Sequence, residues 1–430
     1  MRISVAAGMA SLVGLFVLGP ACSSSSGGSG FGSSSGSSGG SSNGSSGGSS
    51  SSGGGSGGSR SGLLGDGGSS GDDGGGCPVP SPANYPFPGD GCNDDGNGPV
   101  TTAAVCDQTL SATGTAHDFA NAMGLCHDAP ATGPGWGIVS ATYTQGFAGG
   151  SPNDGQHGIL PKFGGVIVPK EGSNLGVLSS GYAREWDDIQ GAYNNDCSSP
   201  YMQTNSSCFK GLQVAMTGAG TAPPGYPKPA AGCMNATSVL DAISVTLKIK
   251  VPANAQGFQF DFDFYSGEWP EYVCTPFNDS FVAWLQSTAF TGNPPMSGDL
   301  NISFDAKNNP VSVNNGFFES CTTNASTGCC NHPPMYACST ATGSPALCMN
   351  GPQELAGTGF EDTGTWCGGQ STGGGATGWL TTKAPAAPGE TITLQFIIWD
   401  TGDPNWDSSV ILDHFTWIKG PTMTGTQPAQ

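Results

Sequence analysis

Hard oxygen donors concentrate in two stretches of this sequence. The first stretch contains Asp261, Asp263, Glu268, Asn278 and Asp279. Carboxylate and amide oxygens are the ligands that Ca²⁺ prefers, and loop carbonyls commonly complete its shell. We therefore predict calcium ligands in this stretch. The alternative is that these residues only shape turns, because Asp and Asn side chains bond readily to nearby backbone.

The second stretch links two apolar segments near the end of the chain. Its loop contains Asp400, Asp403 and Asp407, and the following apolar segment contains Asp413. A carboxylate inside an apolar strand must be hydrogen-bonded, ion-paired or bound to a metal. The same two interpretations apply, so calcium ligands are predicted here as well, with turn formation as the alternative.

Catalysis by two carboxylates and sugar binding by aromatic side chains are the other chemistries to consider. Glu268 and Glu271 lie in one loop, whereas a retaining glycoside hydrolase needs carboxyl groups about 5–5.5 Å apart across a cleft. Sequence spacing does not establish that geometry, so we predict no enzyme, with a polysaccharide-active hydrolase as the alternative. Trp269 and Trp406 lie beside acidic residues and are candidate ligand contacts, although aromatics in sheets more often pack in a core.

Alternating hydrophobicity predicts the strands that would position these residues. A strand is predicted over 239–251, and apolar residues occupy every second position in 243–251, 258–264 and 392–398; a last strand is predicted over 410–418. This pattern between Gly, Pro and Asn turns is typical of antiparallel sheets. We predict a mainly β fold, a two-sheet antiparallel sandwich of jelly-roll type. With the phenyl rings buried, Asp261 and Asp263 would point outward about 7 Å apart.

One short helix is predicted near the start of the folded part. Apolar residues recur at helical spacing between Thr115 and Met123, and Gly124 follows at a position that suits a helix cap. Cys106 and Cys126 flank this segment and are suitably placed to bracket it with a disulfide.

The cysteines and the first residues predict export. Arg2 precedes an uncharged run that ends in small residues before Cys22, which is typical of a secretory signal and is similar to a bacterial lipoprotein signal. We predict lipidation of Cys22 as the membrane anchor, with plain cleavage and secretion as the alternative. Without Cys22 the cysteine number is even, which favours a disulfide framework. Its predicted members are Cys77, Cys92, Cys106, Cys126, Cys197, Cys208, Cys233, Cys274, Cys321, Cys329, Cys330, Cys338, Cys348 and Cys367.

Composition predicts the order of the segments. Ser and Gly dominate after the signal, and such a stretch cannot bury enough apolar surface to fold. The expected segments are a signal (1–22), a Ser/Gly linker (23–76), a Cys/Asp/Pro-rich lead-in (77–112), a sandwich domain (113–420) with a Cys-rich insertion (321–367), and a tail (421–430).

The net charge of the chain argues against one class of binding partner, nucleic acids. The chain has 32 acidic and 12 basic residues, a formal net charge of −20. A phosphate backbone would be repelled, so nucleic-acid binding is not expected. The remaining partners are a membrane through the N-terminal lipid and a polysaccharide or cell-surface protein.

Several segments together resemble the choice-of-anchor L domain of bacterial surface proteins. These are "ANAMGLC", "WGIVSATYTQ", "QHGILPKFGG", "LGVLSSGYAR", and above all "FQFDFDFYSGEWPEYVCTPFNDSFVAWL" (258–285) and "TITLQFIIWDTGDPNWDSSVILDHFTW" (391–417). Gly267 departs from the pattern, which usually has an acidic residue before Glu268. The resemblance implies a β-rich extracellular module on the outer face of the cell envelope and carries no known activity. We expect binding or adhesion with an undefined ligand, with a structural surface-coat role as a further alternative.

Overall fold

The computed structural model describes most of the chain from residue 106 onward. The described residues are 106–130, 132–184, 218–230, 233–269, 272–314, 317, 325–326, 340–341, 350–360 and 374–429.

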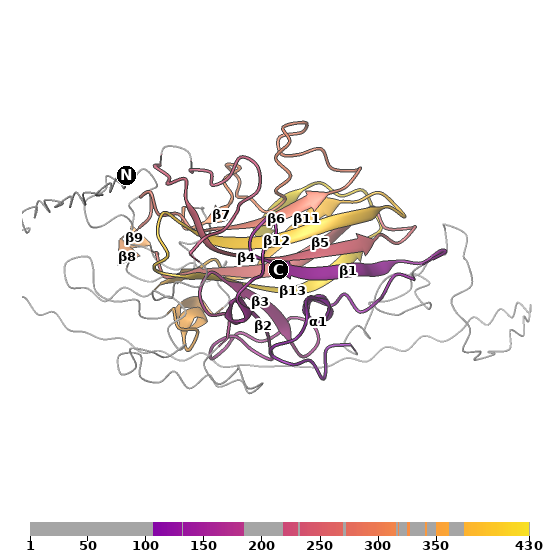
Figure 1. Cartoon of the computed structure of the whole chain (residues 1–430), viewed down its shortest axis with the longest axis horizontal. Helices are drawn as coiled ribbons and strands as arrows, with labels where there is room; N and C mark the ends of the chain where they lie inside the picture. Colours follow the sequence, from indigo (N-terminus) through magenta and orange to yellow (C-terminus); the bar gives the residue numbers. More distant parts are fainter. Residues whose placement is uncertain are drawn as a thin grey trace, which may run out of the picture. The chain divides into compact units, whose positions relative to one another are not determined.

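Two antiparallel sheets form a sandwich, as the alternating pattern predicts (Figure 1). The five-stranded sheet has the order β1 (Gly137–Thr144), β4 (Val239–Lys250), β12 (Thr391–Thr401), β6 (Ser280–Gln286) and β7 (Val311–Ser312). The seven-stranded sheet has the order β14 (Gly425–Pro428), β11 (Leu380–Pro385), β5 (Gly257–Ser266), β13 (Ser408–Ile418), β3 (Leu175–Ser179) and β2 (His157–Leu160), with β10 (Gly375–Ala376) also beside β5. A separate two-stranded sheet pairs β8 (Ala325–Ser326) with β9 (Thr340–Ala341).

The core between the sheets consists of the residues that the alternation places on one strand face. Its fully buried members include Phe258, Phe260, Phe262, Phe264, Ile243, Val245, Leu247, Ile249, Ile392, Leu394, Phe396 and Ile398. Rings from opposite sheets meet directly, since Phe260 lies 4.9 Å from Phe396 and Phe262 lies 5.0 Å from Phe281. Each such side chain contributes about 1.5–3 kcal/mol by its burial, so this core drives the pairing of the sheets.

The outer faces of the sheets are also largely covered, which corrects the expectation that β5 presents a solvated face. Tyr265, Ile411 and Trp379 belong to a second apolar cluster. Asp261 and Asp263 leave only 2% and 0% of their surface exposed. The alternation predicted which side of the strand these residues take, but not the loops that bury that side.

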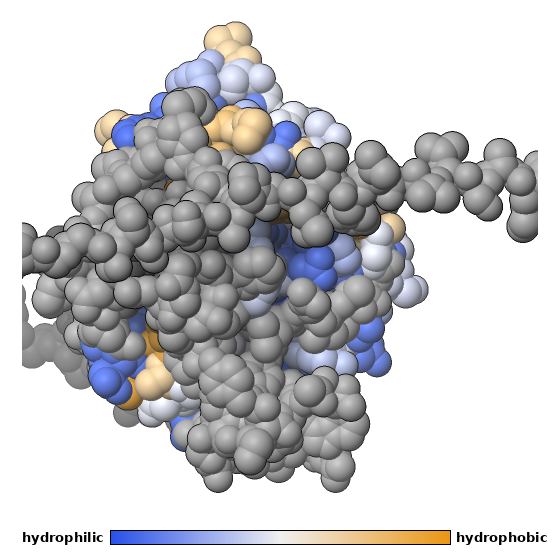
Figure 2. All heavy atoms as spheres, turned by 90° about the vertical axis from the view of Figure 1, so that its left-hand side faces the viewer, coloured by the Kyte–Doolittle hydropathy of each residue, from blue (hydrophilic) through white to orange (hydrophobic). Residues whose placement is uncertain are grey.

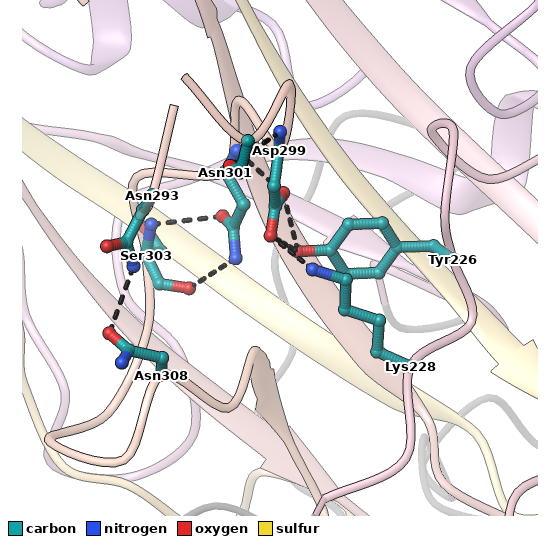
Figure 3. Close-up of polar contacts among 8 residues, drawn as sticks. Tyr226, Lys228, Asn293, Asp299, Asn301, Ser303 and Asn308 are labelled. Atoms are coloured by element: carbon teal, nitrogen blue, oxygen red, sulfur yellow. Dashed lines mark hydrogen bonds and ion pairs between the residues drawn. The ribbon is translucent and has the colours of Figure 1, made fainter. Parts of the chain in front are cut away.

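Residues 218–230 cover part of the outer face of the five-stranded sheet, where Ala222 and Tyr226 pack against the apolar cluster that contains Trp284 and Trp399. Figure 3 shows Tyr226 and Lys228 of this segment beside Asp299. The Tyr226 ring lies edge-on to Trp284 and Trp399, at centroid distances of 6.3 and 6.0 Å. Its hydroxyl donates to Asp299 at 3.2 Å, and Lys228 forms an ion pair with the same carboxylate. Aromatic side chains therefore cover this face, and the Asp299 carboxylate beside them is neutralised by Lys228.

The predicted helix and the glycine that follows it are present, and the structure adds an N-terminal cap that was not predicted. α1 spans Ala116–Ala122, with Thr115 and Asp118 forming a reciprocal capping box. Gly124 follows with φ +93°, a conformation that favours glycine. The Cys106–Cys126 disulfide brackets the helix, as expected.

Two short 3₁₀ helices complete the described elements: η3 (Asp154–Gln156) and η7 (Gly351–Leu355). A second disulfide joins Cys233 to Cys274. The other cysteines predicted to form disulfides lie outside the described residues, as does Cys22. The seven-stranded sheet extends past residue 420, because β14 pairs with β11.

On the face drawn in Figure 2 the coloured residues are mostly hydrophilic, with small separate apolar patches. The large apolar side chains that are exposed come from scattered segments: Val139, Val166, Val168, Met234, Met296 and Met423. Within the described ranges, no helix is long and apolar enough to cross a membrane.

Candidate functional site

Four carboxylates from four strand ends gather at one end of the sandwich. Glu268 follows β5, Asp279 precedes β6, Asp400 lies near the end of β12, and Asp407 precedes β13. The strand register brings these ends together, because Trp399 pairs with Ser280 in one sheet and Ser408 pairs with Ser266 in the other. We call Glu268, Asp279, Asp400 and Asp407 the acidic cluster; each sheet contributes two of its members.

The acidic cluster is buried, with at most 2% of any member exposed. The carboxylate of Asp279 accepts two hydrogen bonds. The backbone N–H of Thr401 donates to Asp279 at 3.0 Å, and the Ser408 hydroxyl donates to it at 2.7 Å. The N–H of Asp279 in turn donates to Glu268 Oε2 at 3.2 Å, which joins the two carboxylates through the backbone.

Asp400 is satisfied far less well. Both of its carboxylate oxygens are buried, and neither accepts a hydrogen bond of normal geometry. Its neighbours are the carboxylates of Asp279 and Asp407 and the hydroxyl of Ser180. That hydroxyl lies 3.3 Å from the Ser408 carbonyl and accepts the Ser408 N–H at 2.9 Å, so the Ser408 backbone competes for it. A buried carboxylate without donors costs free energy as it stands.

Burial disfavours the ionised forms of Asp279, Glu268 and Asp400. Burial raises the pKa of Asp279 to about 7. Burial and the neighbouring Asp279 raise the pKa of Glu268 well above its usual value. The pKa of Asp400 is also raised well above its usual value, by burial first and then by Asp279 and Asp407. The chain thus concentrates negative charge where it is costly to hold.

Three members of the acidic cluster form no ion pair with any described residue. The ion pairs among those residues join Lys170 and His414 to Asp261, Lys228 to Asp299, and His117 to Asp128; none involves Glu268, Asp279 or Asp400. As the side chains are placed, no three His, Cys, Asp or Glu residues within the described ranges form an arrangement that would hold a metal ion.

Asp261 has an entirely different environment. Lys170 Nζ lies 2.6 Å from its Oδ2, His414 Nδ1 lies 2.9 Å from the same oxygen, and the Thr381 hydroxyl donates to Oδ1 at 2.5 Å. Burial pushes the pKa of Asp261 upward, but the bonds from His414, Lys170 and Thr381 outweigh it and hold that pKa below its usual value. We call Asp261, Lys170, Thr381 and His414 the paired site, because its carboxylate is neutralised by the protein itself.

Asp413 anchors the loop that brings Lys170 to the paired site. Its Oδ2 accepts the backbone N–H groups of Lys170 and Glu171, at 2.6 and 3.3 Å. A bulge follows Asp413 in β13, and His414 takes a φ of 54° there. The bulge redirects the His414 side chain toward Asp261. Asp413 is thus hydrogen-bonded to backbone N–H groups. Hydrogen bonding was one of the environments expected for a carboxylate inside this strand.

Asp263 belongs to a third environment. It accepts bonds from the hydroxyls of Tyr265 (2.8 Å) and Thr377 (3.0 Å). Burial and the nearby Glu354 raise its pKa well above the usual value. Asp261 and Asp263 therefore do not share a ligand, although they are two residues apart on one strand.

The two remaining predicted metal ligands lie beside the acidic cluster. Asn278 is buried and accepts the Asn314 N–H at 3.2 Å, so it fixes a loop, as the turn alternative predicts. Asp403 accepts the Asn405 N–H at 3.0 Å in the loop between β12 and β13, and its charge still acts on Glu268 and Asp279.

The two candidate ligand-contact tryptophans differ in access. Trp269 is 2% exposed and belongs to the core between the sheets. It therefore packs in the core, which was the alternative to a ligand contact. Trp406 is half-buried, has a φ of 63°, and lies 6.5 Å from the Tyr272 ring. Of the two, Trp406 is the residue that a ligand can reach.

Sequence reasoning missed the residues that complete the sites. Lys170, Thr381 and His414 neutralise Asp261, and Ser408 bonds to Asp279, but all are distant in sequence from the carboxylates they serve. Only His414 carried a signal, because it interrupts an apolar strand directly after Asp413.

The glycoside hydrolase alternative depends on Glu268 and Glu271. Glu268 is 2% exposed, so a sugar cannot reach it in this arrangement, and Glu271 lies outside the described residues.

Comparison with known proteins agrees with the resemblance found in the sequence. Residues 230–416 match the family model of the Choice-of-anchor L domain. All four members of the acidic cluster lie inside the match, while α1, β1, β2 and β3 precede it. No curated protein and no solved structure matches the chain.

Proposed function

Because residues 230–416 form a choice-of-anchor L domain, which indicates a surface-associated protein, we propose that this chain is an extracellular binding or adhesion module. The family match is the observation that carries the proposal, since the domain belongs to surface proteins and not to an enzyme family. Two features add support. The Cys106–Cys126 and Cys233–Cys274 disulfides suit an oxidising compartment, and the surplus of acidic residues suits a partner other than nucleic acid.

The contact surface that we propose is the loop between β12 and β13. Trp406 presents a large half-buried ring there, next to Tyr272 and between Asp403 and Asp407. Aromatic rings at loop tips bind sugars and protein side chains with little loss of conformational freedom. A polysaccharide or a cell-surface protein is the partner class that fits.

Binding of the purified chain to glycan arrays, extracellular matrix proteins and whole cells tests this proposal. Trp406→Ala should reduce the binding at least tenfold while leaving the unfolding midpoint within a few degrees. Met423→Ala, which also removes a large apolar side chain but from an exposed site outside this loop, is the matched control and should bind normally. A wild-type chain that binds none of these targets would contradict the proposal.

Attachment through a lipid on Cys22 is the second part of the proposed function. The small residues before Cys22 and the Ser/Gly linker after it fit a tethered domain. In a bacterial host, Cys22→Ser should release the protein from the membrane fraction, whereas Ser25→Ala should not. Incorporation of a labelled fatty acid into the wild type alone would complete the test; a wild type that takes up no label would disprove lipidation.

A further inference from the structure

The acidic cluster joins the two sheets with charge of one sign only. Glu268 and Asp407 adjoin the central strands of the seven-stranded sheet, while Asp279 directly precedes β6 and Asp400 lies in the adjacent β12 of the five-stranded sheet. Elsewhere in the described chain, the buried Asp261 is paired with Lys170, and the half-buried Asp299 is paired with Lys228. No ion pair in the described residues involves Glu268, Asp279 or Asp400, so a cation from outside the protein would supply the missing positive charge there.

Asp400 supplies the independent observation that points to a ligand. It is fully buried, and neither carboxylate oxygen accepts a hydrogen bond of normal geometry. The polar groups that contact it are the Ser180 hydroxyl, which also bonds to the Ser408 backbone, and the carboxylate of Asp279. The oxygens of Asp400 face other carboxylates, and this arrangement is stable only if a proton or a cation lies between them.

We propose that Glu268, Asp279, Asp400 and Asp407 bind one Ca²⁺ ion, which links the two sheets at this end of the sandwich. Four carboxylates offer up to eight hard oxygens, and Ca²⁺ takes about 6–8 such ligands with flexible geometry. Mg²⁺ demands strict octahedral geometry and keeps several waters, and structural Zn²⁺ is usually held by cysteine or histidine. The ligand chemistry therefore favours calcium.

Binding requires a local rearrangement of the side chains. The carboxylates do not yet surround a common point, and Asp279 and Asp400 face each other. Rotation of the Asp400 and Asp407 side chains would replace this repulsive contact with shared coordination of the ion. Asp400 lies near the end of β12 and Asp407 is the last residue before β13, so calcium would also order the intervening loop that carries Trp406.

Calorimetric titration of the full chain, first stripped of metal with a chelator, tests the site. We expect one Ca²⁺ per chain and an unfolding midpoint that rises with calcium concentration. Asp400→Asn should lower calcium affinity at least tenfold while the unbound variant stays folded by near-ultraviolet circular dichroism. Glu390→Gln makes the same charge change just before the opposite end of β12 and should bind calcium like the wild type.

Three results would overturn the proposal. One is neither heat nor a midpoint shift at about 10 mM calcium, which exceeds the dissociation constants of about 10⁻³ M of weak extracellular sites. Another is undiminished binding by Asp400→Asn, which would place the ion elsewhere. The third is an equal effect of Mg²⁺, which would remove the case for calcium. Stabilisation by acid without any calcium effect would instead show that protons neutralise the cluster.

Discussion

The paired site and the acidic cluster both bury carboxylates, but they differ in the groups that surround the negative charge. Both contain carboxylates that are at most 2% exposed, and both lie against β5 and β13. In the paired site, Lys170, His414 and Thr381 surround Asp261, and its pKa is lowered. In the acidic cluster, Asp400 faces Asp279 and Asp407, and its pKa is raised. The difference teaches that burial does not decide the charge state of a carboxylate; the groups opposite it do.

Removing the cation from the paired site should give the largest effect. Lys170→Met leaves Asp261 buried with His414 as the remaining cation of the paired site and should cost about 3 kcal/mol of stability. The loss should be larger at pH 8 than at pH 6, since His414 compensates only when protonated. Guanidinium denaturation measures it, with Lys383→Met on β11 as the control, expected to change stability by less than about 0.5 kcal/mol.

Removing a hydroxyl donor from the paired site should have the next largest effect. Thr381→Val preserves volume but removes the 2.5 Å bond to Asp261, and a bond to a charged group is worth about 2 kcal/mol. The neighbouring Thr382 bonds only to the hydroxyls of Ser303 and Thr426, so Thr382→Val should cost about 1 kcal/mol. Equal losses in the two variants would mean that the charge on Asp261 is unimportant.

Replacing a carboxylate by an amide should change stability in opposite directions in the acidic cluster and in the paired site. Without calcium, Asp400→Asn removes one of several facing charges and should stabilise the chain by about 1 kcal/mol, whereas Asp261→Asn should destabilise it by leaving Lys170 unpaired. Parallel denaturation of both variants in chelator compares them directly. Destabilisation by both substitutions would break the distinction between the two sites.

The smallest expected effect is the pH dependence that His414 adds to the paired site. The bond to Asp261 raises the pKa of His414, so the folded state binds its proton more tightly than the unfolded state does. The resulting stability is present at low pH and is lost as the pH rises through the raised pKa. The side chain is 34% exposed, so the contribution should stay below about 1 kcal/mol.

His414→Asn tests this effect, because Asn tolerates the φ of 54° at this position. The wild-type-minus-variant difference should shrink between pH 6 and pH 8. A difference that grows over this range would contradict the assigned direction.

The sequence predicted the fold more completely than the site, for a physical reason. Period-two alternation is local, so Phe258–Phe264 and residues 243–249 already show which face packs inward. The capping residues Thr115 and Gly124 are local signals too. The environment of each carboxylate depends on the tertiary fold. Asp261 and Asp263 share a strand face, yet Asp261 contacts Lys170, whereas Asp263 contacts Tyr265 and Glu354.

The acidic cluster was predictable in part. Its four members were all candidate ligands in the sequence, because each carboxylate occurs near a strand end among turn formers. Their selection from a larger set required the strand register that joins β6 to β12 and β5 to β13. Burial of Trp269 likewise depended on how the loop after β5 folds back onto the core, which no pattern in the sequence reveals.

The most direct test of this account is a crystal structure of the chain grown in calcium, with anomalous scattering data. We expect one strong peak bounded by oxygens of Asp279, Asp400 and Asp407, with Glu268 completing the shell, and no peak at Asp261. Carboxylates in direct contact across an ion-free cluster, at saturating calcium and neutral pH, would contradict it.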